Sequence, residues 1–410
     1  MKRLNSIFKM DKKNRHQILL WLIGGLILTF ATEIFLRGSV KEVVSWVKET
    51  PGVMLANYLL ILMLTSIFFL AKRKYMVYFI SFVVILGVSI TTFFLMKVRG
   101  TPLTFSDLYS IGEAMEIADK YINPTIIIIG IVCIAFLVVF CVFLYKLDGD
   151  TKRFKLINFV LVFVVSAVFF TTVRSQQAKN IMVYKRWDIP ASYKCNGLTY
   201  STVESCLKYI RTKPNDYSQS KIAKIKEKVD KAEANDNRKL NKNKPNVLFV
   251  QLEAFMDPET IKGVKYSKDP IPNFRKLTKL YTSGMANVPT TGGGTVRTEF
   301  EVMTGNNIDY LTPGEIPYST ILKSKYYNSV ATTLSSQGYE THAVHNFQGN
   351  FYGRNNAYGK LGFGDFTSQE YMSGYELNER NWIKDKILTK YIKKALDSTE
   401  GSDLVYTVTV

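Results

Sequence analysis

The second half of this 410-residue chain is organised around the sequence Asn246-Val247-Leu248-Phe249-Val250-Gln251-Leu252-Glu253. This short apolar run follows Pro245 and is rich in β-prone residues, which predicts a buried strand. Ligands of open α/β sheets gather outside the carboxyl ends of the strands, so the Glu253 carboxylate is well placed to hold a cation. Taken alone, Glu253 is more ordinarily interpreted as a capping or first-turn acid of a helix.

A glycine-rich stretch comes next and reads Pro289-Thr290-Thr291-Gly292-Gly293-Gly294-Thr295-Val296-Arg297-Thr298-Glu299-Phe300. Glycines let the backbone approach a ligand closely. The spacing of Phe300, Val302 and Met303 predicts a helix that begins at Thr295. A helix N-terminus attracts anions, and a hydroxyl held there can attack phosphorus when a metal lowers its pKa. The ordinary alternative is an N-cap role for Thr295. The stretch is not a Walker A loop, because the Gly-Lys-Ser/Thr ending is missing.

Two of the three histidines lie in a third cluster, which runs from residue 341 to residue 355. The residues up to His345 are typical of a turn that leads into a strand. On a strand, His342 and His345 face opposite sides, so we do not expect them to bind one ion together. Arg354 carries the planar fork that suits a phosphodiester. Tyr352 is placed to stack on, or hydrogen bond to, a glycerol or lipid head group.

Five apolar stretches precede residue 175, at residues 18–36, 50–71, 75–96, 121–145 and 156–173. Each reaches about 18 residues, the length that crosses the hydrocarbon core of a bilayer. Glu33 is the one charged residue within them, and its place near the end of the first stretch favours a snorkelling side chain. The first stretch is too long for a signal peptide, and no small-residue cleavage site follows it.

Loop charges predict the orientation. The N-terminal tail and the loops after the second and fourth stretches hold 13 Lys and Arg, against 6 in the opposite loops. The positive-inside rule therefore places the N-terminus in the cytoplasm. Five crossings then put everything after residue 174 outside the cell. Because ATP is scarce there, a transferase in this part of the chain must use a donor that the membrane delivers.

The formal net charge of +19, from 53 Lys and Arg against 34 Asp and Glu, suits anionic membrane lipid or an anionic polymer. Nucleic acid is not expected, because neither a zinc-finger spacing nor an aromatic RNA-binding motif is present. Four cysteines exclude a disulfide scaffold, although Cys195 and Cys206 could pair. Within residues 221–244 a short amphipathic helix is predicted. It acts either as a solvated spacer or as a helix that lies on anionic head groups.

Together, these features resemble the lipoteichoic acid synthase family, which are membrane phosphoglycerol transferases with an external sulfatase-like, alkaline-phosphatase-like domain. The motifs that carry the resemblance are residues 246–253, 294–300 and 345–354. The resemblance implies a multi-pass α-helical membrane domain with five spans over residues 1–174 and a basic helical linker over 175–245. Residues 246–410 would be the N-terminal part of the external α/β sulfatase-like catalytic domain.

The resemblance also implies an activity and a set of site residues. The activity is transfer of glycerol phosphate from phosphatidylglycerol to a glycolipid or a growing polyglycerolphosphate chain. Glu253 would bind a divalent metal, usually Mn²⁺ in this family, and Thr295 would be both a metal ligand and the nucleophile. His345, Tyr352 and Arg354 would line the pocket for the glycerol-phosphate group.

The sequence departs from the family in several places. The family commonly has Trp where this chain has Tyr352, and Asp where it has Phe347. Thr295 stands where sulfatases that use formylglycine have a Cys/Ser-x-Pro-x-Arg signature, so sulfate-ester hydrolysis is not expected. The family also continues from a strand like residues 404–410 to a histidine and an Asp-His metal pair. We therefore expect a fragment of an active enzyme, rather than a degenerate paralogue, with an incomplete metal site.

Other functions stay open. A different membrane phosphotransferase of the same fold, such as a phosphoethanolamine transferase, or a phosphate or sulfate ester hydrolase, would share these motifs. An inactive fragment that binds anionic polymer through its basic surface would show no metal dependence. A transporter is not expected, because the five apolar stretches contain almost no polar residues.

Overall fold

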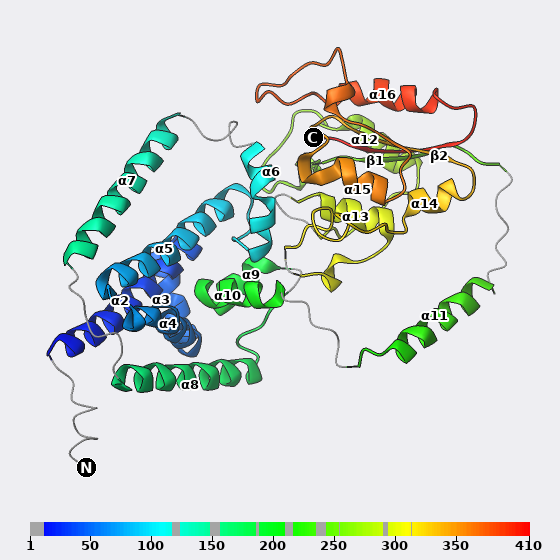
Figure 1. The fold of residues 1–410 in the computed structure, drawn as a ribbon. Coiled ribbons are helices and arrows are strands. Elements are labelled where there is room, and N and C mark those ends of the chain that lie inside the picture. The colour runs from blue at the N-terminus through cyan, green and yellow to red at the C-terminus, as the bar shows by residue number, and fades with distance from the viewer. Residues whose placement is uncertain are drawn as a thin grey trace. The chain divides into compact units, whose positions relative to one another are not determined.

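The computed structural model describes residues 12–116, 124–147, 156–185, 188–209, 216–234, 243–253, 255–289, 294–312 and 314–410. The chain forms two compact units, whose elements are labelled in Figure 1. The helical unit comprises Met1–Ile210, Thr291–Gly293 and Leu311–Glu315. The sheet unit comprises Arg211–Thr290, Gly294–Tyr310 and Ile316–Val410.

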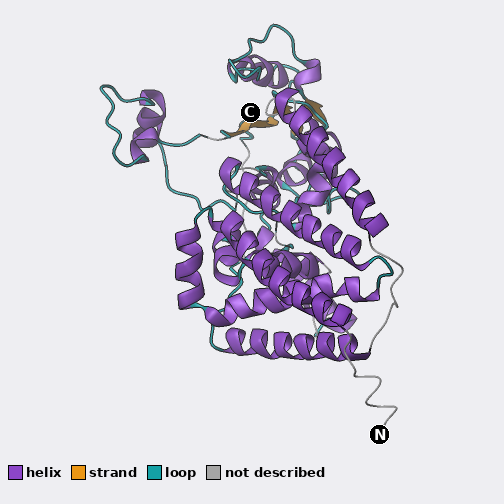
Figure 2. Ribbon diagram, turned by 90° about the vertical axis from the view of Figure 1, so that its left-hand side faces the viewer, coloured by secondary structure: helices purple, strands orange, loops and turns teal. Residues whose placement is uncertain are grey.

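Among its described residues, the helical unit contains five helices that are long and apolar enough to cross a membrane, as predicted. They are α2 (Lys12–Arg37), α4 with the 3₁₀ turn η1 (Pro51–Thr65 and Ser66–Leu70), α5 (Lys74–Val98), α7 (Pro124–Leu147) and α8 (Leu156–Ala178). Figure 2 shows the prevalence of helix in the chain. Residues 121–123, where the fourth predicted stretch begins, lie outside the described residues. The shorter elements are α3 (Val40–Glu49), η2 (Phe105–Ser110), α6 (Ile111–Glu116), α9 (Ile189–Asn196) and α10 (Leu198–Tyr209).

Buried polar groups tie the helices of this unit together. The Trp21 indole N–H donates to the carbonyl of Leu62 at 3.0 Å, which joins α2 to α4. Glu33 is fully buried, pairs with Arg37 and accepts a hydrogen bond from the Leu198 backbone N–H at 2.8 Å. The predicted snorkelling of Glu33 is therefore wrong, because partners inside the protein neutralise and solvate the carboxylate.

All four cysteines are free. Cys195 donates through its thiol to the carbonyl of Ile181 at 3.0 Å instead of pairing with Cys206. The open possibility of a disulfide between these two residues is therefore not realised.

The sheet unit is built on four parallel strands in the order β1-β4-β2-β3. They are β1 (Val247–Gln251), β2 (Glu340–His345), β3 (Asp365–Thr367) and β4 (Asp403–Val408). The predicted strands at residues 246–252 and up to His345 are confirmed. Every residue of β4 is buried, because this strand pairs with both β1 and β2. Since all strands run the same way, their carboxyl ends meet at one edge of the sheet.

Helices cover both faces of this sheet. The described helices of this unit include α12 (Pro272–Leu280), α13 (Val296–Thr304), α14 (Val330–Ser335), α15 (Arg354–Lys360) and α16 (Lys386–Leu396), with 3₁₀ turns at Pro258–Thr260, Ile308–Tyr310, Phe351–Gly353 and Gln369–Tyr371. Tyr391 of α16 packs with Val344 and Val405 on one face. Tyr358 of α15 lies on the other face, with its ring 6.2 Å from that of Tyr406.

The predicted amphipathic helix is present as α11 (Gln219–Ala234). Ile222, Ile225 and Val229 are exposed to between 47 and 50%. The apolar stripe of this helix is therefore uncovered in the sheet unit.

Candidate active site

The carboxyl edge of the sheet gathers the predicted site residues of the strands. The register pairs Gln251 at the end of β1 with Val408 at the end of β4, and His345 at the end of β2 with the same Val408. Glu253 lies two residues after the end of β1, and its backbone N–H donates to the Thr409 hydroxyl at 2.8 Å. The strand order thus brings Glu253 and His345 to one edge from positions almost 100 residues apart.

Thr295 stands immediately before α13 and does not cap it. Its backbone is helical, with φ −55° and ψ −26°, and its side chain makes no capping hydrogen bond. Instead the Thr295 side chain lies near the Glu253 carboxyl, whose pKa it lowers. The N-cap interpretation therefore does not describe this hydroxyl, which lies near the carboxylate.

Backbone geometry at Gly294 supports this arrangement. Gly294 has φ +79°, a conformation that residues with a side chain rarely adopt, and a Cβ there would lie 3.3 Å from Cζ of Arg297. The last glycine of the run is therefore required by the turn that presents Thr295. Gly292 and Gly293, to which the close-approach argument also applied, lie outside the described residues.

The Glu253 carboxyl is in an environment that disfavours its charge. Burial raises its pKa to about 7, and the Thr295 side chain and the positive charge of Arg354 only partly offset this. Its Oε1 atom is buried and has no hydrogen-bond partner among the described residues. Because a buried carboxylate oxygen is costly without a partner, this atom fits a bound cation.

Arg354 is held by a buried carboxylate. Its Nη2 atom lies 2.6 Å from Oε1 of Glu299, and Tyr358 donates to Oε2 of Glu299 at 2.9 Å. Glu299 is 0% exposed and Arg354 is 1% exposed. The Nη1 atom of Arg354 is buried without a partner among the described residues, so it is a donor available to an anionic ligand.

Tyr352 lies near the backbone of Gly294, the residue before Thr295. Its ring centroid is 5.5 Å from Cζ of Arg354. Burial raises the pKa of its phenol, against the opposing effect of Arg354. The backbone of Tyr352 has φ 58°, a left-handed conformation that is costly for an aromatic residue and is found mostly at functional sites.

His345 has a defined tautomer. Its Nδ1 atom lies 2.9 Å from the carbonyl oxygen of Val408. A carbonyl only accepts, so Nδ1 carries the hydrogen and Nε2 of the neutral ring presents a lone pair. Burial and the nearby charge of Arg354 hold the pKa of His345 well below its usual range. His345 is therefore a neutral acceptor at the edge of the sheet.

His342 belongs to a different environment, as the strand alternation predicted. Its Nδ1 lies 2.6 Å from Asp365 and its Nε2 lies 3.2 Å from the buried Asp403. Asp365 and Asp403 open β3 and β4, and His342 lies two residues into β2, so this cluster lies toward the amino edge, away from His345.

Sequence reasoning overlooked Glu299 and placed only the residues around it. Glu299 follows Thr295 by one helical turn, and an acid between the buried Val296 and Phe300 was the available signal. Phe347, where the resemblance implies Asp, is 5% exposed and packs against Phe351 and Trp382, with ring centroids 5.1 and 4.8 Å away. An apolar cluster thus occupies that position.

The metal-binding roles of Glu253 and Thr295, and the pocket roles of His345, Tyr352 and Arg354, stay predictions. In the described part of the chain, no group of three or more His, Cys, Asp or Glu side chains is arranged to hold a metal ion. Glu253 and Thr295 are therefore only part of the ligand set that a metal ion needs.

Comparison with known proteins finds similarities to the sheet unit. Residues 245–410 match the sulfatase family. The chain is 30% identical over 224 residues to a protein of Rhizobium meliloti (strain 1021) named "Putative cyclic beta-1,2-glucan modification protein". This match covers 55% of the chain and 33% of the relative, so the chain spans about a third of that protein.

Two solved structures are similar in part. The Streptococcus pyogenes phosphoglycerol transferase GacH, in complex with sn-glycerol-1-phosphate, is 25% identical with a TM-score of 0.42, over 48% of this chain and 53% of GacH. The lipooligosaccharide phosphoethanolamine transferase EptA from Neisseria meningitidis is 15% identical with a TM-score of 0.48, over 95% of this chain and 68% of EptA. The predicted fold class is confirmed by the family match over residues 245–410 and by the five apolar helices.

Proposed function

We propose that this chain transfers glycerol phosphate from phosphatidylglycerol to a hydroxyl of a glycolipid or of a growing polyglycerolphosphate chain, as in lipoteichoic acid synthesis. The observation that carries the proposal is that the Thr295 hydroxyl makes no capping bond and lies near the Glu253 carboxyl at the carboxyl edge of the sheet. A hydroxyl in this setting, rather than in a capping bond, is suited to nucleophilic attack.

Glu253 and Thr295 would hold a divalent metal, Mn²⁺ in the family that the sequence resembles. Such an ion, when bound, lowers the pKa of a hydroxyl and stabilises negative charge on phosphoryl oxygens. The unpartnered Oε1 of Glu253 is the ligand atom that supports this assignment. With the carboxylate engaged, the Thr295 hydroxyl is held in one orientation toward the substrate.

The reaction then has two displacements. In the first, the bond between Thr295 Oγ1 and phosphorus forms, the bond from phosphorus to the diacylglycerol oxygen breaks, and the proton lost by Thr295 is balanced by one gained by diacylglycerol. In the second, an acceptor hydroxyl takes the glycerophosphoryl group and Thr295 regains its proton. Arg354 Nη1 binds a phosphoryl oxygen, and His345 Nε2 accepts from a glycerol hydroxyl.

The location of this chemistry follows from the loop charges. The five apolar helices indicate a membrane protein. We infer that the N-terminus is cytoplasmic and that the catalytic residues are extracellular, where phosphatidylglycerol of the outer leaflet supplies the donor phosphodiester without ATP. Anionic membrane lipid then forms the surface on which the chain acts and also supplies the donor substrate.

A second candidate differs in the acceptor. The relative from Rhizobium meliloti is named for modification of a cyclic β-1,2-glucan. The same first displacement, followed by attack of a sugar hydroxyl, would place the glycerophosphoryl group on a glucan. Supplying a glucan and a glycerol-phosphate acceptor separately to the same preparation distinguishes the two, because only the true acceptor gains phosphorus.

Release of diacylglycerol from labelled phosphatidylglycerol tests the proposal. Thr295→Ala in the full chain should abolish release, whereas the Thr295→Ser variant, which keeps a hydroxyl, should retain measurable release. The apolar helices and the sheet should be unaffected, because Thr295 is only half-buried and makes no capping bond. Undiminished release by Thr295→Ala would refute the assignment of the nucleophile.

A further inference from the structure

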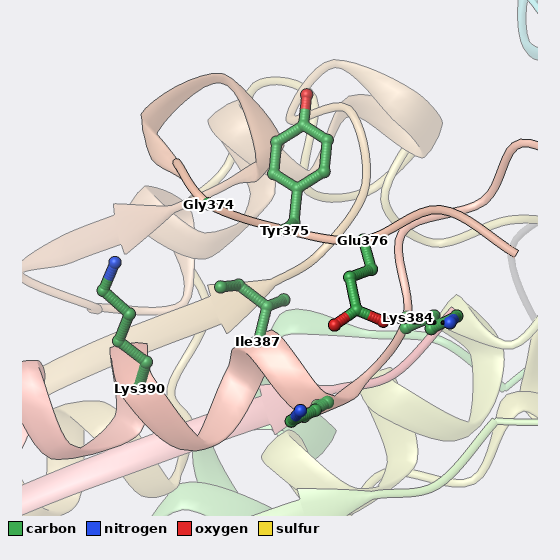
Figure 3. A pocket seen from close by; sticks show the side chains of 7 residues that line it. Gly374, Tyr375, Glu376, Lys384, Ile387 and Lys390 are labelled. Atoms are coloured by element: carbon green, nitrogen blue, oxygen red, sulfur yellow. Dashed lines mark hydrogen bonds and ion pairs between the residues drawn. The ribbon is translucent and has the colours of Figure 1, made fainter.

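A small cavity lies between α16 and the hairpin that precedes it. The hairpin is closed by a bridge between Leu377 and Ile383 and by the hydrogen bond from the Asn378 N–H to the Trp382 carbonyl at 2.8 Å. The cavity has a volume of about 220 Å³, and its lining residues are Gly374, Tyr375, Glu376, Lys384, Lys386, Ile387 and Lys390. Figure 3 shows the side chains that surround it.

The charge around this cavity is unbalanced. Three lysines line it against one carboxylate, that of Glu376, which pairs with Lys384 at 2.9 Å. Lys390 Nζ donates to the carbonyl of Ser373 at 3.3 Å, a neutral partner. Lys386 begins α16 directly after Asp385, the N-cap residue, whose side chain makes no capping bond. A cation at this end of a helix opposes the helix dipole.

The cavity adjoins the edge of the sheet that carries the active site. Asp385, the residue between two of the lysines, accepts from the Asn346 side chain at 3.0 Å, and Asn346 directly follows His345. Ile383 accepts from the same side-chain amide at 2.9 Å. The wall of the cavity is therefore fastened to the residue next to the proposed glycerol-phosphate pocket.

We propose that this cavity, here called the lysine pocket, binds a phosphodiester group of the acceptor chain and so holds the chain while its end is extended. The ligand class is a phosphodiester anion, which carries one negative charge and has oxygens that lysines bind. Three lysines that line one cavity suit a bound phosphate group rather than a flat charged surface. The proposal rests on the proposed function for the identity of the chain, but binding itself requires no turnover.

Lysine footprinting tests the pocket directly. The full chain in neutral detergent is acetylated with and without glycerophosphoglycerol, a soluble phosphodiester, and the modification rate of each lysine is followed by mass spectrometry. At a ligand concentration ten times the dissociation constant, acetylation of Lys386 and Lys390 should slow about tenfold. Lys393, which is exposed on the same helix but outside the pocket, is the internal control.

Three results would overturn the proposal. Equal protection of Lys393 would show general screening of the basic chain. Protection by inorganic phosphate but not by the diester would exclude the ligand class. Protection only by vesicles that contain phosphatidylglycerol, and not by the soluble diester, would assign these lysines to the membrane surface.

A pair of double variants connects the pocket with elongation. K386Q/K390Q should raise the KM for a glycerol-phosphate acceptor chain about tenfold. K279Q/K393Q removes the same charge elsewhere and should leave this KM unchanged. If protection is seen without any transfer by the parent chain, the proposed function fails and the pocket stands. If transfer occurs and both double variants behave alike, the pocket fails and the function stands.

Discussion

Glu299 and Arg354 form a fully buried ion pair, with 2.6 Å between Glu299 Oε1 and Arg354 Nη2. This pair joins α13 to α15, and Glu299 lies one helical turn after Thr295. Breaking a buried pair leaves an uncompensated charge, at a cost of about 3–5 kcal/mol. Glu299→Gln should therefore lower the free energy of unfolding by an amount of that order, which urea unfolding measures.

A paired replacement separates stability from catalysis. Apolar residues of similar volume often replace a buried ion pair without loss of stability. Glu299→Leu combined with Arg354→Met should restore much of the stability lost in Glu299→Gln, yet release of diacylglycerol should stay absent because the Nη1 donor is gone. Recovery of release in the double variant would show that Arg354 serves only the fold.

Metal binding should depend on Glu253. Loss of a metal-centre partner costs about 10–100-fold in affinity, so Glu253→Gln should weaken Mn²⁺ binding by at least about tenfold in a calorimetric titration. The thermal stabilisation that Mn²⁺ gives to the parent chain should shrink accordingly. The matched control is Glu340→Gln, at an exposed acid at the start of β2. Equal affinities in the two variants would remove Glu253 from the metal site.

Stability should fall with rising pH because of His342. The Asp365 hydrogen bond raises the pKa of His342 above its ordinary value, although burial opposes this. A raised pKa in the folded state means that the stabilisation is fully present below about pH 6.5, the unfolded pKa, and is lost as pH rises through the folded pKa. The midpoint of thermal unfolding should fall between about pH 6 and about pH 8. Asp365→Asn should flatten this decline, whereas an unchanged slope in that variant would contradict the assignment.

Replacing Phe347 by Asp, the residue that the family commonly has there, should destabilise the fold. Removing a buried Phe costs about 3–5 kcal/mol, and a buried carboxylate adds a desolvation penalty. Phe347→Asp should therefore lower the unfolding midpoint strongly, and Phe347→Leu only slightly. If Phe347→Asp were as stable as the parent chain, the contacts with Phe351 and Trp382 could not be what holds this loop.

Much of the fold could be predicted from local patterns. The five apolar stretches and the strand before Glu253 are continuous in sequence, so their length and composition were sufficient. The snorkelling of Glu33 was mispredicted because its partners depend on tertiary structure. Leu198 lies 165 residues away along the chain.

The candidate site divides in the same way. Motif spacing located Thr295 and Glu253, but the partner of Arg354 depends on how α13 meets α15, which periodicity does not encode. The lysine pocket depends on a hairpin that folds against α16, and the sequence shows only scattered lysines there. Sequence reasoning therefore did not find the residues whose partners lie far away along the chain.

In the proposed mechanism, Thr295 becomes covalently attached to the transferred group. Rapid acid quenching of the full chain with phosphatidylglycerol and Mn²⁺, without an acceptor, followed by peptide mass spectrometry, tests it most directly. The account predicts an adduct with the mass of glycerol phosphate on the peptide that contains Thr295, and its absence in Thr295→Ala. Release of diacylglycerol with no adduct on Thr295, or an adduct on another residue, would contradict the account.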